Sequence, residues 1–150
     1  MHVRHVMRTA VHTVTADQKL LAAEDAMHAA QVRHLPVVDR HGHPIGVLSD
    51  RDVLRASVSA VETRIASYER QQHLRSITVG QVMSPASHVA SPDTTVRQAA
   101  ATMRTFHIDC LPVVDHDRLV GIVTAFDLLG LVVHLTDDSL AAAGAAHAAK

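Results

Sequence analysis

The stretch Leu35-Pro36-Val37-Val38-Asp39 returns as Leu111-Pro112-Val113-Val114-Asp115, a displacement of 76 residues (112 minus 36). Five consecutive identities in a chain of 150 residues indicate an internal repeat. The same displacement aligns Val6-Met7 with Val82-Met83, Ala10 with Ala86, Asp17 with Asp93 and Met27 with Met103. Beyond the Pro-containing stretch the displacement falls to 75 (121 minus 46), which aligns Gly46 with Gly121, Ser49 with Thr124 and Asp52 with Asp127. The second repeat has therefore lost one residue from a turn.

Both repeats predict the same order of elements. Short apolar stretches at 11–15 and 88–90 predict a strand, and a helix follows in each repeat, for which Asp17 and Asp93 are plausible caps. The apolar faces of these helices are formed by Leu20, Ala23, Met27 and Ala30 and by Val96, Ala99, Met103 and Phe106. Two β-rich runs at 35–38 and 45–48 then flank a hairpin turn at 39–44, which is shortened to 115–118 in the second repeat. A second helix begins near Asp50 and near Ala125.

One such unit, with three short strands and two helices, leaves a sheet face uncovered. Two copies packed sheet to sheet cover it, so we expect a single α/β module (α+β by some schemes) with pseudo-two-fold symmetry. The expected division is a first motif at 1–56, a helical connection at 57–76, a second motif at 77–134 and an Ala-rich, frayed tail at 135–150.

The connection carries Val58, Val61, Ile65 and Tyr68 at spacings of three and four, which predicts a helix. Such a helix either serves as a dimerisation or partner helix or lies on its own domain, and the pattern does not choose between them.

Composition argues against several classes of protein. Hydrophobic residues make up 47% and charged residues 19% of the chain, with a formal net charge of -1, so we expect a soluble globular protein with no nucleic-acid partner. No run approaches the length of a membrane span, and the N-terminus lacks the apolar run of a signal peptide. Cys110 is the only cysteine, which favours a cytoplasmic location.

The two repeats resemble the CBS (cystathionine β-synthase) domain family, whose motif ends in a Leu-Pro-Val-Val-Asp strand, a turn and a Gly-x-x-Ser/Thr-x-x-Asp segment. The resemblance covers roughly residues 3 to 55 and 76 to 133, and the connecting helix resembles that of bacterial acetoin-utilisation-type CBS proteins. It implies a Bateman module: a pseudo-two-fold pair of motifs, usually paired again as a homodimer in a flat disc, with clefts for an adenosine-containing ligand between the motifs.

Ser49 and Thr124 stand where a strand meets a helix, beside unpaired N–H groups that attract phosphate. Asp52 and Asp127 follow three residues later, and each carboxylate can accept hydrogen bonds from both hydroxyls of a ribose. The alternative is that all four residues merely cap their helices. Recurrence of the pattern in both repeats favours ligand binding.

The resemblance also implies base-contacting positions, which are His12, Arg33, His34 and Pro36 in the first repeat and His88, Asp109, Cys110 and Pro112 in the second. We expect Arg33 and His34 to join Ser49 and Asp52 in one site, and Asp109 and Cys110 to join Thr124 and Asp127 in the other. The cationic or ionisable groups of the first site should favour a phosphate-rich ligand such as ATP. The bulky imidazole of His34 either narrows that pocket or stacks on the base.

Metal binding and catalysis are the sharper alternatives. The pairs His41 with His43 and His2 with His5 are scattered or lie in a turn, so no metal site is expected. Cys110 precedes a buried strand and is expected to pack rather than react, and no catalytic motif is present, so we expect no enzyme activity and no catalytic residue.

The prediction is a non-catalytic regulatory module for energy sensing. It would bind AMP, ADP or ATP ahead of S-adenosylmethionine or NAD, and would pass its output to a separate effector protein. The alternative is a structural adaptor dimer with empty clefts.

Overall fold

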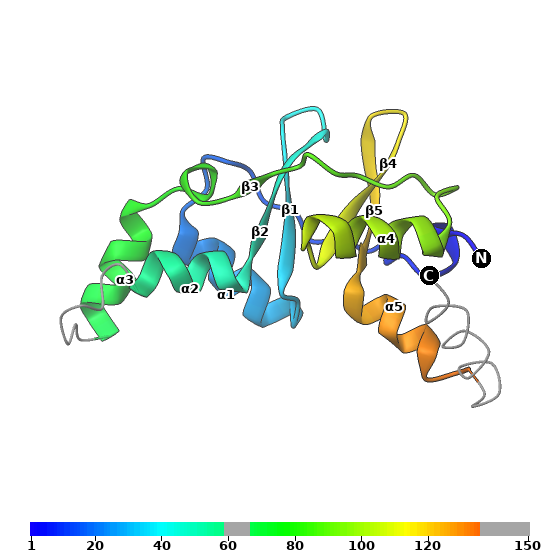
Figure 1. Cartoon of the computed structure of the whole chain (residues 1–150). Helices are drawn as coiled ribbons and strands as arrows, with labels where there is room; N and C mark the ends of the chain where they lie inside the picture. The colour runs from blue at the N-terminus through cyan, green and yellow to red at the C-terminus, as the bar shows by residue number, and fades with distance from the viewer. Residues whose placement is uncertain (59–66, 136–150) are drawn as a thin grey trace.

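The computed structural model describes residues 1–58 and 67–135 (Figure 1). Its helices are α1 (Leu20–Ala30), α2 (Asp50–Val58), α3 (Ser67–Ser76), α4 (Val96–Phe106) and α5 (Ala125–Val132), with 3-10 turns η1 (Val3–His5) and η2 (Val79–Gln81). Its strands are β1 (His34–Val38), β2 (Pro44–Ser49), β3 (Ser84–Pro85), β4 (Cys110–Asp115) and β5 (Arg118–Thr124). The expected mixture of helices and small antiparallel sheets is confirmed, and so are the starts of α2 and α5.

Each repeat is built around one hairpin. β1 pairs with β2 so that His34 lies opposite Ser49, and β4 pairs with β5 so that Cys110 lies opposite Thr124. The shortened second turn is possible because His116 and Asp117 both have positive φ, 48° and 63°, as in type I′ hairpin turns. The hairpins stand side by side in Figure 1, and Leu119 N donates to Gly42 O at 3.2 Å between their tips.

The segment that begins each repeat crosses to the sheet of the other repeat. Arg8 forms a bridge with Ile122 of β5, and Ser84 in β3 pairs with Val47 of β2. The aligned glycines permit this approach: a Cβ at Gly121 would lie 2.9 Å from Met7 Sδ and 3.0 Å from Arg8 O, and a Cβ at Gly46 would meet the second crossing segment as closely. The repeat glycines are therefore required for close packing between the repeats.

This exchange produces two hydrophobic cores, each with residues from both repeats. Leu74 and Val79 pack with Leu35 and Val37 in one core, while Val3 packs with Leu111 and Val113 in the other. Leu74 comes from α3, whose Arg70 also forms a two-pronged ion pair with Glu24 of α1 at 2.6 and 3.1 Å. The described part of the connecting helix thus lies on its own domain.

Several residues of the predicted connection and tail lie outside the part of the chain that the structure describes. Val61, Ile65 and the tail Ser139–Lys150 fall outside the described residues, as does the side chain of Val58. Tyr68 is 69% exposed and forms no part of a packed face.

Three local predictions are wrong, and the first is the pair of helix caps. Asp17 and Asp93 do not cap the helices, because both lie two residues before the true N-caps, Lys19 and Thr95. Asp17 instead accepts a hydrogen bond from Thr15 Oγ1 at 2.6 Å, and Asp93 forms an ion pair with Arg4.

The apolar stretches 11–15 and 88–90 form no full strand. Each contributes a single parallel bridge, Val14 with Val37 and Ala90 with Val113. Phe106, expected on the apolar face of α4, is 51% exposed and instead contacts the ring of His88.

Candidate ligand clefts between the two repeats

The cleft that contains Ser49, here called the first cleft, is lined by both repeats. The first repeat supplies polar residues from the start of β1, the end of β2 and the start of α2. The second repeat supplies residues around the start of β4 and from β3, the strand that crosses to β2. The residues that matter below are His34, Ser49, Arg51, Asp52 and Arg55, with Ser84, His88, Asp109, Cys110 and Pro112 opposite.

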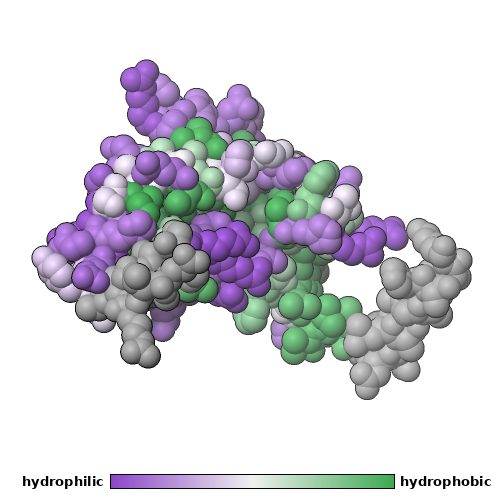
Figure 2. All heavy atoms as spheres, turned by 60° about the vertical axis from the view of Figure 1, so that its left-hand side comes forward, coloured by the Kyte–Doolittle hydropathy of each residue, from purple (hydrophilic) through white to green (hydrophobic). Residues whose placement is uncertain are grey.

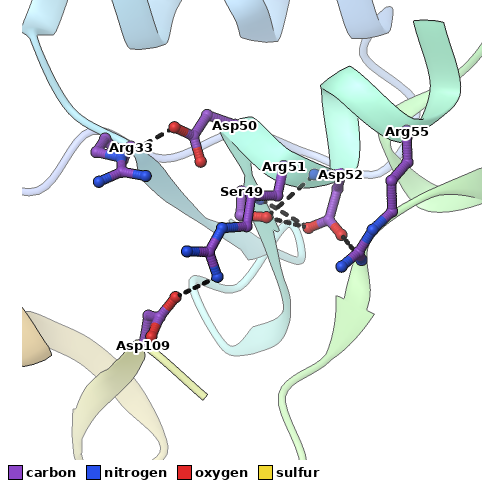
Figure 3. A network of polar contacts seen from close by, with 7 residues as sticks. All are labelled: Arg33, Ser49, Asp50, Arg51, Asp52, Arg55 and Asp109. Atoms are coloured by element: carbon purple, nitrogen blue, oxygen red, sulfur yellow. Dashed lines mark hydrogen bonds and ion pairs between the residues drawn. The ribbon is translucent and has the colours of Figure 1, made fainter. Parts of the chain in front are cut away.

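Ser49 and Asp52 form a reciprocal cap at the start of α2 (Figure 3). Asp52 Oδ2 accepts from Ser49 N at 2.9 Å and from Ser49 Oγ at 2.7 Å, while Asp52 N donates back to Ser49 Oγ at 3.2 Å. The capping alternative is therefore confirmed as a structural role. It uses one carboxylate oxygen, and Oδ1 faces only Arg55 at 3.5 Å among the ion pairs of the described residues.

Two ion pairs border the cleft that contains Thr124, and the residues of one of them, Arg51 and Asp109, also line the first cleft. Arg33 Nε lies 2.9 Å from Asp50 Oδ2, and Arg51 Nη1 lies 3.0 Å from Asp109 Oδ2 (Figure 3). The second pair joins the two repeats, because Arg51 lies in the first turn of α2 and Asp109 precedes β4. The hydrogen bond to Asp50 raises the pKa of Arg33, so its guanidinium remains charged and is engaged by a partner.

Burial controls the two other ionisable groups at the repeat junction. It lowers the pKa of His34, so this imidazole is uncharged at neutral pH and does not supply the cation that the sequence suggested. Burial also raises the pKa of Cys110 to about 12. Cys110 is buried, as a packing residue is expected to be, and a buried thiol of this kind is a poor nucleophile.

The cleft that contains Thr124, here called the second cleft, has the same cap with a different cation. Asp127 Oδ2 accepts from Thr124 N at 2.9 Å and from Thr124 Oγ1 at 2.6 Å. Its other oxygen, Oδ1, accepts from Arg8 Nε at 3.0 Å. This cleft is lined by Arg8, Arg33, His34, Asp109, Ile122, Thr124 and Phe126, among others.

The structure groups the predicted residues differently from the expectation. Cys110 lines the cleft of Ser49 and Asp52 rather than that of Thr124, and Arg33 lines the cleft of Thr124 rather than that of Ser49. The reason is the packing between sheets, which places the segment before β4 over the start of α2. His34, Arg51 and Asp109 lie between the clefts and line both.

Three other predicted residues lie apart from these linings. His12 is exposed and Pro36 is fully buried in the sheet, and neither lines a cleft. Asp127 is only 10% exposed and meets the second cleft through Arg8.

Three arginines of the clefts escaped the sequence analysis: Arg8, Arg51 and Arg55. The repeat alignment could have found them, because each replaces a different kind of residue in the other repeat. The aligned pairs are Arg8 with Ser84, Arg51 with Phe126 and Arg55 with Gly130. Arg55 lines the first cleft alone and Arg8 the second alone, whereas Arg51 lines both, and Phe126 lines the second.

The two repeats also differ in the aromatic groups near their clefts. His88 and Phe106 stack with ring centroids 3.7 Å apart, and His88 lines the first cleft. The aligned residues in the first repeat are His12 and Ala30, which cannot form this pair.

Two further observations concern residues 1–58 and 67–135 alone. No group of three or more His, Cys, Asp or Glu side chains in these ranges is arranged to hold a metal ion. No helix in the same ranges is long and apolar enough to span a membrane.

Known proteins match the chain over both repeats. Among solved structures, a protein assigned to acetoin utilization (AcuB) from Vibrio cholerae is 29% identical, with a TM-score of 0.72 over 89% of this chain and 91% of that one. CBSX2, solved in complex with AMP, is 26% identical, with a TM-score of 0.73 over 90% and 98%.

The CBS domain pair of protein MJ0100, in complex with 5′-methylthioadenosine and S-adenosyl-L-methionine, is also 26% identical, with a TM-score of 0.73 over 88% and 99%. The family profile described as CBS domain matches residues 3–59 and 79–134, which correspond to the two repeats. The chain therefore belongs to the CBS domain family, as a tandem pair of CBS motifs.

Proposed function

We propose that this chain is a regulatory module that binds an adenosine-containing ligand in the first cleft, with AMP, ADP or ATP favoured over S-adenosylmethionine and NAD. The observation that carries the proposal is the Ser49–Asp52 pair: its carboxylate caps α2 with one oxygen and offers the other to the cleft. Similar CBS pairs have been solved with AMP and with S-adenosyl-L-methionine.

Asp52 Oδ1 is suited to a ribose. An ionised carboxylate oxygen accepts two hydrogen bonds, which matches the two adjacent hydroxyls of that sugar. Phosphate is the wrong partner for this oxygen because both are anionic. In this proposal the ribose lies against Asp52 and the phosphate lies farther out.

The phosphate is proposed to bind Arg51 and Arg55, whose side chains are 62% and 78% exposed and line the first cleft. The start of α2 adds unpaired N–H groups and the positive end of the helix dipole. The base is proposed to lie near His88 and Pro112, where an aromatic ring and a buried apolar surface border the cleft.

The Arg51–Asp109 pair suggests how binding becomes a signal. Both side chains are at least half exposed, so the pair contributes only about 0–1 kcal/mol and is easily exchanged. A phosphate that recruits Arg51 would release Asp109 of the other repeat. A ligand that binds one arrangement of the repeats better shifts the population toward it.

A thermal-shift series with AMP, ADP, ATP, S-adenosylmethionine and NAD tests the proposal. A ligand at 100 times its dissociation constant stabilises the native state by about 2.7 kcal/mol. For a chain of this size the expected rise in Tm is about 5–10 °C.

Asp52→Asn should remove the ligand-induced shift while keeping an oxygen to cap α2. Asp25→Asn, at an exposed position of α1 outside both clefts, is the matched control. No shift with any ligand would overturn the proposal.

A second candidate function, a structural adaptor, is favoured by an exposed apolar surface. The groove between α4 and α5 has a volume of about 850 Å³ and is lined largely by apolar side chains. Leu129 and Val133 are 62% and 80% exposed, and Figure 2 shows hydrophobic surface (green) near the end of the described chain. Exposed apolar patches are typical of protein contact sites.

We therefore extend the proposal to a homodimer that uses this groove and acts on a separate effector protein in the cytoplasm. Sedimentation velocity should show a dimer that Leu129→Asp dissociates, with circular dichroism unchanged. A monomer at all concentrations would contradict the dimer. Dimerisation without any ligand-induced thermal shift would leave the adaptor as the function.

A further inference from the structure

The carboxylate of the second cleft is already saturated by the protein. Four donor atoms lie close to it: Thr124 N at 2.9 Å and Thr124 Oγ1 at 2.6 Å from Oδ2, and Arg8 Nε and Nη2, both at 3.0 Å from Oδ1. A carboxylate offers about four lone-pair positions. Asp127 therefore has no acceptor position left for the hydroxyls of a ribose.

The contact between Arg8 and Asp127 is held in place from the backbone. Arg8 N donates to Ile122 O at 2.9 Å, and Ile122 N donates to Arg8 O at 3.0 Å. The absence of a side chain at Gly121 lets the two strands approach this closely. Because the backbone of Arg8 is already fixed, only the rotamer freedom of its side chain is lost when it meets Asp127.

The first cleft lacks an equivalent contact. The residue aligned with Arg8 is Ser84. Its side chain is short and uncharged, so it cannot form an ion pair with Asp52. Beyond its cap with Ser49, Asp52 has one ion-pair partner among the described residues, Arg55, three residues later on the same helix at 3.5 Å. The side chains of Arg55 and Asp52 are 78% and 13% exposed, and a pair at this distance whose cation lies largely in solvent is weak and screened.

We propose that Arg8 closes the second cleft to ribose, so that each chain binds one adenosine-containing ligand, in the first cleft. This inference rests on the proposed function. A ligand in the second cleft would have to displace charge-assisted contacts to a carboxylate that is 10% exposed. Loss of the two Arg8 contacts lowers the affinity of the second cleft by more than about a hundredfold relative to the first.

Titration calorimetry with AMP tests the inference on four versions of the full chain. The unaltered chain should bind with a stoichiometry of one. Arg8→Ser, which copies the residue of the first cleft, should raise the stoichiometry to two. Ser84→Arg, the reverse exchange, should reduce binding at the first cleft by tenfold or more.

Arg4→Ser is the matched control, because Arg4 lies on the same N-terminal segment but pairs with Asp93 outside both clefts. It should keep a stoichiometry of one. Retained binding at the first cleft shows that the Arg8→Ser chain is folded.

Two results would overturn the inference while leaving the proposed function intact. One is a stoichiometry of two for the unaltered chain. The other is a stoichiometry that stays at one in a folded Arg8→Ser chain. Absence of AMP binding in every version would instead remove the proposed function for AMP, and the inference with it.

Discussion

Replacing Arg51 with alanine separates the phosphate contact from the rest of the proposed site. Arg51 lines the first cleft and forms a 3.0 Å ion pair with Asp109, with the two side chains 62% and 50% exposed. An exposed pair contributes about 0–1 kcal/mol to folding. Arg51→Ala should therefore lower the free energy of unfolding by less than about 1 kcal/mol.

The effect on AMP binding should be larger than the effect on folding. A hydrogen bond to a charged group contributes about 1.5–3 kcal/mol. Part of this is offset, because Arg51 must leave Asp109 to reach the phosphate, at a cost of up to about 1 kcal/mol. The net loss is about 1–2 kcal/mol, or about 5- to 30-fold in affinity for AMP.

The assay is titration calorimetry with AMP and with adenosine, which lacks the phosphate. Arg51→Ala should weaken AMP binding by the stated factor and leave adenosine binding within about twofold. The unaltered chain should lose affinity for AMP, and much less for adenosine, as salt screens the exposed guanidinium. Arg40→Ala is the matched control, because Arg40 lies in the β1–β2 turn and contacts His41.

Equal losses for the two ligands would refute the assignment of Arg51 to phosphate. So would AMP affinity that does not change.

Three further predictions concern the packing and ionisation of the fold. Leu74→Ala should lower the free energy of unfolding, measured in urea, by about 2–5 kcal/mol, because Leu74 of α3 is fully buried in the core that contains Leu35 and Val37. Leu54→Ala, at a position 60% exposed, should cost less than about 0.5 kcal/mol, and equal losses would count against the packing of α3. With its pKa raised to about 12, Cys110 should react with iodoacetamide at pH 8 at least about a hundredfold more slowly in the native chain than in urea, and similar rates would show the thiol to be accessible. Burial lowers the pKa of His34, so below the unfolded value of about 6.5 the unfolded state binds a proton that the native state does not. The free energy of unfolding of the unaltered chain minus that of His34→Gln should thus be constant above about pH 7 and should fall as the pH drops below it. A difference that does not change with pH would contradict the burial of this imidazole.

The repeat and its hairpins could be predicted because their signals are local. The identical Leu-Pro-Val-Val-Asp stretches mark β1 and β4, and Ser49 and Thr124 stand where each hairpin gives way to a helix. The positions of Asp17 and Asp93 misled the prediction of helix starts, since Thr95, two residues later, holds the capping geometry of α4.

The composition of the clefts could not be predicted, because it depends on contacts between residues far apart in the chain. Arg8 reaches Asp127 only after the N-terminal segment has crossed to β5, and no local pattern around Arg8 reports that crossing. The packing of the sheets likewise brings Asp109 over Arg51. Comparison of aligned positions shows at which residues the clefts differ, and the tertiary structure shows which contacts those residues form.

The most direct test of the central claim is an amide ¹H–¹⁵N titration of the full chain with AMP. If the ligand lies between the repeats, the amides of Ser49, Arg51 and Asp52 should shift together with those of Asp109 and Cys110, with one saturation curve. Shifts confined to one repeat, or no shifts at millimolar AMP, would contradict a nucleotide site between the two CBS motifs.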